Sequence, residues 1–241
     1  MTALPVMTEL GRGLGWHAGE VLAMLWMYLD ESGEHDREDG HQKSLALGGG
    51  IAPLSAWEAL SLDWAGTLES FAIPAFHMTD FEARAKSFQG WSEDRRRALL
   101  SGLLDIAVKY VPLFFGTVDK GDKPGFRARY HANLAKTITT IWSASQNSNE
   151  PITVVFAAHE EISAELMGRA FDFWNKDGDL TFDGFANPLR VCPLQVADIV
   201  AYEFNRAARS VRPAQTRYPL ERLKKRHCFL LHAETLGVVD L

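Results

Sequence analysis

The stretch Val21-Leu-Ala-Met-Leu-Trp-Met-Tyr-Leu29, which runs directly into Asp30-Glu31, is the first indication of how this chain folds. A continuous apolar run of this length is typical of a strand that helices bury on both faces. It is about half of the ~20 residues that span a bilayer, so it predicts no membrane segment. The next apolar run, from Ser44 through three consecutive glycines to Ile51, predicts a second strand paired with the first as a hairpin.

After this hairpin, expected helices and strands alternate along the chain. The aromatic and β-branched runs Tyr110–Val118 and Ile152–Ala158 are typical of strands. Phe71–Phe76 is expected to form a shorter strand. Helices are expected over residues 53–70, from Ser92 as N-cap to about 107, over 130–143, up to about 173 and over 194–209. This order predicts one α/β domain whose mixed sheet is covered by helices on both faces.

Composition limits the classes of protein that the chain can belong to. Of its 241 residues, 46% are hydrophobic and 23% are charged, as in an ordinary globular protein. Only two cysteines occur, which excludes a disulfide scaffold and a cysteine-rich zinc module and favours a cytoplasmic location. We expect a lead-in segment over residues 1–20 and a single domain over 21–241, which ends in a basic C-terminal extension.

The charge of the chain is unevenly distributed. The formal net charge is −6, yet residues 206–226 hold eight lysines and arginines against one glutamate, while residues 30–39 hold six acidic residues against one arginine. The basic stripe over 206–226 is compatible with binding the backbone of a polyanion such as nucleic acid. An ordinary solvated surface explains it equally well.

Acidic residues follow three of the predicted strands. Asp30-Glu31 ends the first run, Asp119 follows Val118, and Glu160-Glu161 come just after Ala158. Ligands of open α/β sheets bind beyond the carboxyl ends of strands, so these side chains converge if the strands are parallel neighbours. The alternative is that acids simply begin solvent-exposed loops.

Asp198 favours the first of these interpretations. It is the only charged residue between Leu194 and Tyr202, and it lies on the apolar stripe of a predicted helix, with Gln195 one turn earlier in a position to orient it. Burying a carboxylate is costly unless it is paired or binds a cation, although an arginine partner or a loop cap is an alternative. Carboxylates without a cysteine or histidine framework suit Mg²⁺ or Mn²⁺. Two such ions about 3.5–4 Å apart can promote phosphodiester cleavage.

Two motifs resemble a known family. Tyr28-Leu-Asp-Glu-Ser-Gly33 and Leu194-Gln-Val-Ala-Asp198 are similar to the signature motifs of the domain of unknown function 3800 family, over residues 24–210. His77-Met-Thr-Asp80 and Val118-Asp119-Lys120 resemble its weaker internal motifs. The resemblance implies an RNase H-like three-layer fold with a mixed five-stranded sheet. In that superfamily, carboxylates on the first strand, at the end of the fourth strand and on the last helix bind the catalytic metal.

The resemblance and the residue pattern together predict a nuclease that hydrolyses phosphodiester bonds of DNA or RNA with Mg²⁺ or Mn²⁺. Asp30, Asp119 and Asp198 match the metal-binding positions, and Glu31 is expected to be a further ligand or to orient water. The residues expected to position substrate or carboxylates are Ser32, His77, Asp80, Lys120, Glu160 and Gln195. Two alternatives stay open: an inactive RNase H-like binding or regulatory module, for example of a mobile-element or phage-defence system, and a small-molecule phosphohydrolase. The sequence does not indicate an oligomeric state.

Overall fold

The first strand occupies the centre of a mixed sheet. The computed structural model describes residues 25–33, 44–119, 126–145, 151–159, 162–174, 180–209, 217–232 and 238–240. In it, β1 (Leu25–Gly33) lies between an antiparallel neighbour, β2 (Leu45–Pro53), and a parallel one, β4 (Ile152–Ala157). β3 (Leu113–Asp119) pairs antiparallel with β2, and β5 (Leu180–Ala186) pairs parallel with β4. The order β3-β2-β1-β4-β5 confirms the predicted α/β fold with a mixed five-stranded sheet, and it is consistent with an RNase H-like fold.

The sheet also extends beyond these five strands. β6 (His227–His232) pairs parallel with β3, and β7 (Val238–Asp240) pairs antiparallel with β6, so the sheet has seven strands. The sequence does not predict these two strands, because they follow a basic segment and the edge of β3 that β6 pairs with is over a hundred residues away in the chain.

The expected strand over Phe71–Phe76 does not form. The backbone N–H groups of Phe71, Ala72 and Ile73 instead bond to carbonyls in the last turn of the preceding helix. Ile73 and Phe76 are buried among helices, so their apolar character reflects the core and not a place in the sheet.

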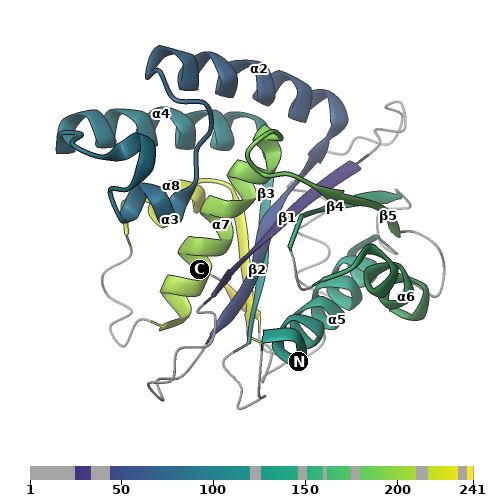
Figure 1. Ribbon diagram of the computed structural model, residues 1–241. Coiled ribbons are helices and arrows are strands. Elements are labelled where there is room, and N and C mark those ends of the chain that lie inside the picture. Colours follow the sequence, from purple (N-terminus) through teal and green to yellow (C-terminus); the bar gives the residue numbers. More distant parts are fainter. Residues whose placement is uncertain are drawn as a thin grey trace.

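Helices cover both faces of the sheet, as Figure 1 shows. One apolar cluster contains residues of the helices that precede β3 and of those that follow β5, and it lies on one face of the sheet. A second cluster contains residues of the two helices between β3 and β5, and it lies on the other face. The helices are α2 (Leu54–Ser70), α3 (Met78–Glu82), η1 (Lys86–Phe88), α4 (Glu93–Tyr110), α5 (Phe126–Ser145), α6 (Ala164–Trp174), α7 (Cys192–Arg209) and α8 (Tyr218–Leu223). Ser92 is the predicted N-cap of α4, and its side chain accepts a bond from the N–H of Arg95. Among the described helices, none has the length and apolarity needed to cross a membrane.

Two glycines let α7 lie directly on the sheet. Asp30, Gly48 and Gly116 form one row across β1, β2 and β3. A Cβ atom at Gly48 would lie 2.8 Å from the backbone nitrogen of Ala201 in α7, and one at Gly116 would lie 2.3 Å from the ring of Phe204. Because these two glycines have no side chains, α7, the helix with Asp198, can pack directly against the strands beside Asp30.

We expect Gly48→Ala to destabilise the protein by about 1–3 kcal/mol, because the new methyl group meets backbone that cannot rotate away. Urea denaturation of the variant and the wild type measures this difference. Gly66→Ala is the matched control, since a Cβ at Gly66 meets nothing within 4 Å. In the middle of α2 this change should be neutral or stabilising. Equal stability of Gly48→Ala and wild type would contradict the close approach of α7.

Candidate carboxylate site

Asp30 and Asp198 lie between β1 and α7. Side chains alternate along β1: Leu29 packs into the cluster with α5 and α6, whereas Tyr28 packs into the opposite cluster. Asp30 therefore faces the side of the sheet that α7 covers. It is 8% exposed, and Asp198 is 5% exposed. The burial predicted for Asp198 is confirmed.

A short helix start holds the carboxylate of Asp198. The backbone N–H of Met78, the first residue of α3, donates a 2.6 Å hydrogen bond to Asp198 Oδ2. His77, the residue before Met78, has its Nδ1 3.1 Å from Asp80 Oδ2. Lys86 Nζ lies 2.9 Å from the same Asp80 oxygen. The charges of His77 and Asp80 both act on the pKa of Asp198. The structure thus brings the sequence-predicted residues His77 and Asp80 beside Asp198.

Glu31 joins the cluster from the other side of β1. Its backbone N–H donates a 2.8 Å bond to Asp30 Oδ1. The strand alternation turns its side chain toward α5 and α6, and Glu31 Oε1 lies 3.7 Å from His159 Nε2, just beyond β4. Burial, followed by the charges of Glu31 and Asp30, raises the pKa of Tyr130 of α5. Neither His159 nor Tyr130 is indicated by the sequence pattern.

Burial and mutual repulsion favour the protonated forms of these carboxyl groups. Burial, then the charges of Glu31 and Asp198, hold the pKa of Asp30 well above its ordinary value. Burial raises the pKa of Glu31 to about 7. It raises the pKa of Asp198 to about 6, although His77 and the Met78 N–H act in the opposite direction. Asp30 and Asp198, two buried acids whose charges repel each other, form an arrangement that a cation would stabilise.

Asp119 lies away from this cluster. It ends β3, the third strand along the chain, so it does not end the fourth strand as the resemblance implies. Thr117, two residues earlier, bonds to Thr137 of α5, so Asp119 also faces the α5 side, where it acts on the pKa of Lys136. The register of β2 places it level with Gly33, on the face of the sheet opposite to Asp30. The structure therefore does not bring Asp119 together with Asp30 and Asp198.

The other predicted residues have different positions. Ser32 follows Glu31 on β1, and the alternation places it on the face of Asp30. Lys120 and Glu160 lie outside the described residues.

Gln195 is buried, but its side chain does not orient Asp198. Its Oε1 accepts hydrogen bonds from Trp64 Nε1 at 2.9 Å and from the N–H of Phe76 at 3.0 Å. Its Nε2 donates to the carbonyl of Pro188 at 3.1 Å. The Gln195 side chain thus links three parts of the structure: α2, the segment that precedes α3, and its own helix α7.

We expect Gln195→Ala to cost about 2–4 kcal/mol of stability, because two buried donors, Trp64 Nε1 and the Phe76 N–H, lose their acceptor. Thermal and urea unfolding measure the loss. Gln89→Ala is the control, since Gln89 is exposed at the end of η1. A loss no greater than that of the control would show that Gln195 is not needed for this junction.

Several arginines of the basic stripe are bonded within the protein. Arg222 bonds to Asp105, and Arg226 bonds to carbonyl oxygens of Val108 and Lys109, all on α4. Arg217 bonds to Glu82 at 2.6 Å, and Arg206 lies 3.8 Å from the same residue. These contacts attach α8 and the preceding residue to α3 and α4. These four arginines of the 206–226 stripe therefore make contacts between elements, and binding of a polyanion by the stripe stays a prediction.

Glu203 is a buried acid that the sequence pattern does not single out. It lies on α7, is 1% exposed, and its Oε1 is 3.1 Å from Arg217 Nη1. Burial raises its pKa to about 7, and this effect outweighs the attraction of Arg217. An available signal is that Glu203 follows Val196, Ile199 and Val200 by seven, four and three residues, which places it on an apolar face of the same helix.

Comparison with protein-family models, curated proteins and solved structures finds no match for this chain. The resemblance to the domain of unknown function 3800 family therefore stays a prediction. Within the part of the chain that the structure describes, no three aspartate, glutamate, histidine or cysteine side chains are grouped so that they could hold a metal ion.

Proposed function

We propose that the protein is an RNase H-like hydrolase that cleaves phosphodiester bonds of DNA or RNA with the help of Mg²⁺ or Mn²⁺. The observation that supports this most is the cluster of Asp30, Glu31 and Asp198. Asp30 and Asp198 are buried and the Glu31 side chain is 14% exposed, their charges act on one another, and among the described residues no lysine or arginine contacts them. A folded protein keeps buried acids together at a cost in stability, and a bound cation is one way to offset that cost.

The donor set fits a magnesium ion that is only partly enclosed by protein. Mg²⁺ keeps several waters and is commonly held through one or two carboxylates together with substrate phosphate, so a cage of three protein ligands is not required. Asp30 and Asp198 would hold the ion in this proposal. When bound, the ion supplies charge stabilisation at the phosphoryl group and lowers the pKa of a bound water.

Residues of the chain itself hold the two carboxylates in position and supply a side chain that can bind substrate. The Met78 N–H fixes one oxygen of Asp198, and the Glu31 N–H fixes one oxygen of Asp30. His77 is 39% exposed in its side chain and is oriented by Asp80, so in its protonated form it can bind a phosphate oxygen next to Asp198. Glu31, with a pKa of about 7 and His159 nearby, is suited to holding a proton near neutral pH.

The experiment that tests this function is hydrolysis of single-stranded and double-stranded DNA, RNA and DNA–RNA hybrid, with Mn²⁺, with Mg²⁺ and with a chelator. We expect cleavage of at least one polymer that depends on the cation. Turnover of nucleotides with none of the polymers cleaved would instead support a small-molecule phosphohydrolase. Absence of turnover on all substrates with either cation would overturn the proposal of an enzyme.

The position of Asp119 favours a second candidate, a binding or regulatory module on the same fold. With Asp119 on the opposite face, the cluster has fewer acids than the resemblance implies. Such a module would bind nucleic acid without cleaving it and would show no Mn²⁺-dependent rise in melting temperature. A rise that Asp30→Asn removes would favour the hydrolase.

A further inference from the structure

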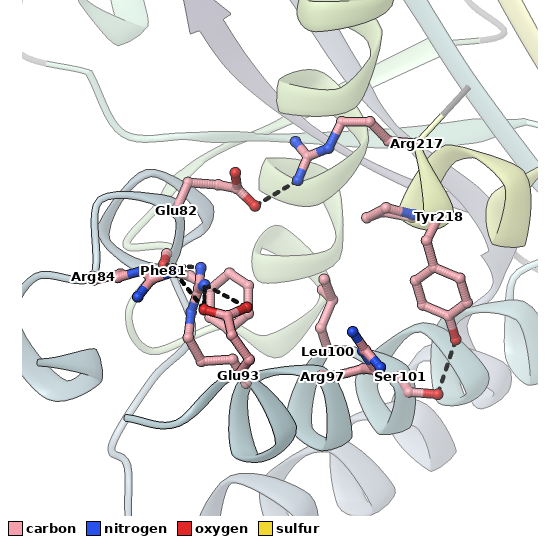
Figure 2. Close-up of a pocket in the computed structure, with 11 residues that line it drawn as sticks. Phe81, Glu82, Arg84, Glu93, Arg97, Leu100, Ser101, Arg217 and Tyr218 are labelled. Carbon is pink, nitrogen blue, oxygen red and sulfur yellow. Dashed lines mark hydrogen bonds and ion pairs between the residues drawn. The ribbon is translucent and has the colours of Figure 1, made fainter. Parts of the chain in front are cut away.

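A separate pocket of about 760 Å³ lies between α3, α4 and α8, as Figure 2 shows. Its volume falls in the range of small-molecule sites, roughly 300–1,000 Å³. Phe81 and Glu82, at the C-terminal end of α3, line it, whereas the residue that contacts Asp198 is Met78 at the other end of that helix. The pocket is therefore a different site from the carboxylate cluster.

The lining of this pocket has an excess of positive charge. Four arginines and two glutamates line it, which leaves a formal charge of +2 (4 − 2). Glu93 is shared by Arg84 and Arg96, and Arg217 bonds to Glu82. The two glutamates are thus already engaged, and they do not neutralise the remaining cationic charge.

Arg97 supplies a guanidinium group that no described residue of the protein binds. It is exposed on α4 and lines the pocket, and it has no hydrogen bond or ion pair with any described residue. In Figure 2 dashed lines join Glu82 to Arg217, Glu93 to its arginines and Ser101 to Tyr218, and none reaches Arg97. A guanidinium group of this kind is suited to bidentate recognition of a phosphate or carboxylate group.

The other wall of the pocket is apolar and aromatic. Leu100, Tyr218 and Pro219 line it, and Tyr218 is 49% exposed, which is unusual for a large side chain in the described part of the chain. The hydroxyl groups of Tyr218 and Ser101 are 2.9 Å apart, which fixes the position of the tyrosine ring. An ordered, half-exposed ring beside cationic groups suits a ligand with a flat apolar part and an anionic part.

We propose that this pocket binds a small organic phosphate, with the phosphate group on Arg97 and the apolar part against Leu100, Tyr218 and Pro219. A phosphate monoester carries close to two negative charges at neutral pH, which matches the +2 of the lining better than a single carboxylate does. The proposal does not depend on the hydrolase activity, because it uses no residue of the carboxylate cluster.

The test is titration calorimetry of the full chain with AMP in the presence of a chelator, which prevents cation-dependent binding at Asp30 and Asp198. We expect saturable binding below about 1 mM and binding of adenosine at least about tenfold weaker, since adenosine lacks the phosphate. Arg97→Ala should weaken AMP binding by roughly tenfold or more, as expected for the loss of a charge-assisted hydrogen bond.

Arg169→Ala is the matched control, because Arg169 is an exposed arginine on α6 whose ion pair is with the exposed Glu165. It should leave AMP binding unchanged, and both variants should keep the wild-type melting temperature. The proposal is overturned if AMP does not bind, if adenosine binds as tightly as AMP, or if Arg97→Ala binds AMP as wild type does.

Discussion

Asp198→Asn is expected to lower cation-dependent hydrolysis of nucleic acid by at least about 100-fold, since the loss of even an outer-shell partner of a metal ligand costs 10–100-fold. The substitution removes one of the two carboxylates proposed to hold the ion. Asparagine keeps an oxygen that can accept the Met78 N–H, so the contact between α7 and α3 should persist. Removing a charge from a site where burial raises the pKa also spares the protein a desolvation cost, and we expect the variant to fold at least as stably.

The measurement is the initial rate on the best polymer substrate with Mn²⁺, together with the melting temperature of each protein. Asp172→Asn is the control, because it makes the same chemical change at an exposed position of α6. If Asp198→Asn and wild type cleave at the same rate, then Asp198 does not take part in the reaction. If the rate falls only because the variant unfolds, the melting temperatures will show it.

Arg217→Met is expected to destabilise the protein by about 2–3 kcal/mol at pH 8. The substitution removes the bond with Glu82, and Glu203, whose pKa is already about 7, takes up a proton at a cost of only about 1.4 kcal/mol. Glu203 is 1% exposed and Arg217 is its nearest cation, at 3.1 Å. The other charged groups that act on Glu203 are Glu82, which repels it, and Arg206, which attracts it more weakly than Arg217 does. Without Arg217, an ionised Glu203 would be buried with little compensation.

The loss should be smaller at pH 5 than at pH 8. Burial raises the pKa of Glu203 from its ordinary 4.5 to about 7, so between these values the folded protein binds a proton that the unfolded chain does not. Stability from this group is therefore fully present below about pH 4.5 and falls as the pH rises toward 7, by about 3 kcal/mol in all. At pH 5 Glu203 is protonated and neutral in both the wild type and Arg217→Met, so the loss of the Arg217 charge has little effect on its contribution to stability.

Urea denaturation at pH 5 and pH 8 measures these differences. Glu203→Gln should flatten the pH dependence, and the double variant Arg217→Met with Glu203→Gln should recover the pH-dependent part of the stability lost at pH 8. A destabilisation by Arg217→Met that is the same at both pH values, and that Glu203→Gln does not relieve, would assign the effect to the bond with Glu82 instead.

Local pattern was sufficient for the central elements. The apolar run before Asp30 and the glycine-rich run after Ser44 form the predicted hairpin, and the helix with Asp198 lies where its apolar stripe indicates. The burial of Asp198 follows from the same stripe. These features depend on residues close together in the chain, and their spacing is visible in the sequence.

The composition of the site depended on long-range contacts. A continuous apolar run such as that before Asp119 does not indicate which residues face which side of the sheet, and the alternation of β3 turns Asp119 toward α5. Gln195 lies one turn from Asp198, yet Trp64 and Phe76 take its acceptor oxygen. Arginines that form a stripe in sequence are distributed among Glu82, Asp105 and backbone carbonyls once α8 packs.

The sequence by itself determined the class of fold, the hairpin at its centre and the two acids, Asp30 and Asp198, that the proposal assigns to the metal. Periodicity and burial are properties of single segments, so they can be inferred before the segments meet. Only the tertiary structure decided that α7 packs on Gly48 and Gly116 beside Asp30, and that Asp119 lies on the other face of the sheet. It also decided that Arg217 pairs with Glu203, whereas Arg97 has no partner among the described residues. Those outcomes depend on strand register and on which helices share a face, and both are set by contacts between residues distant in the chain.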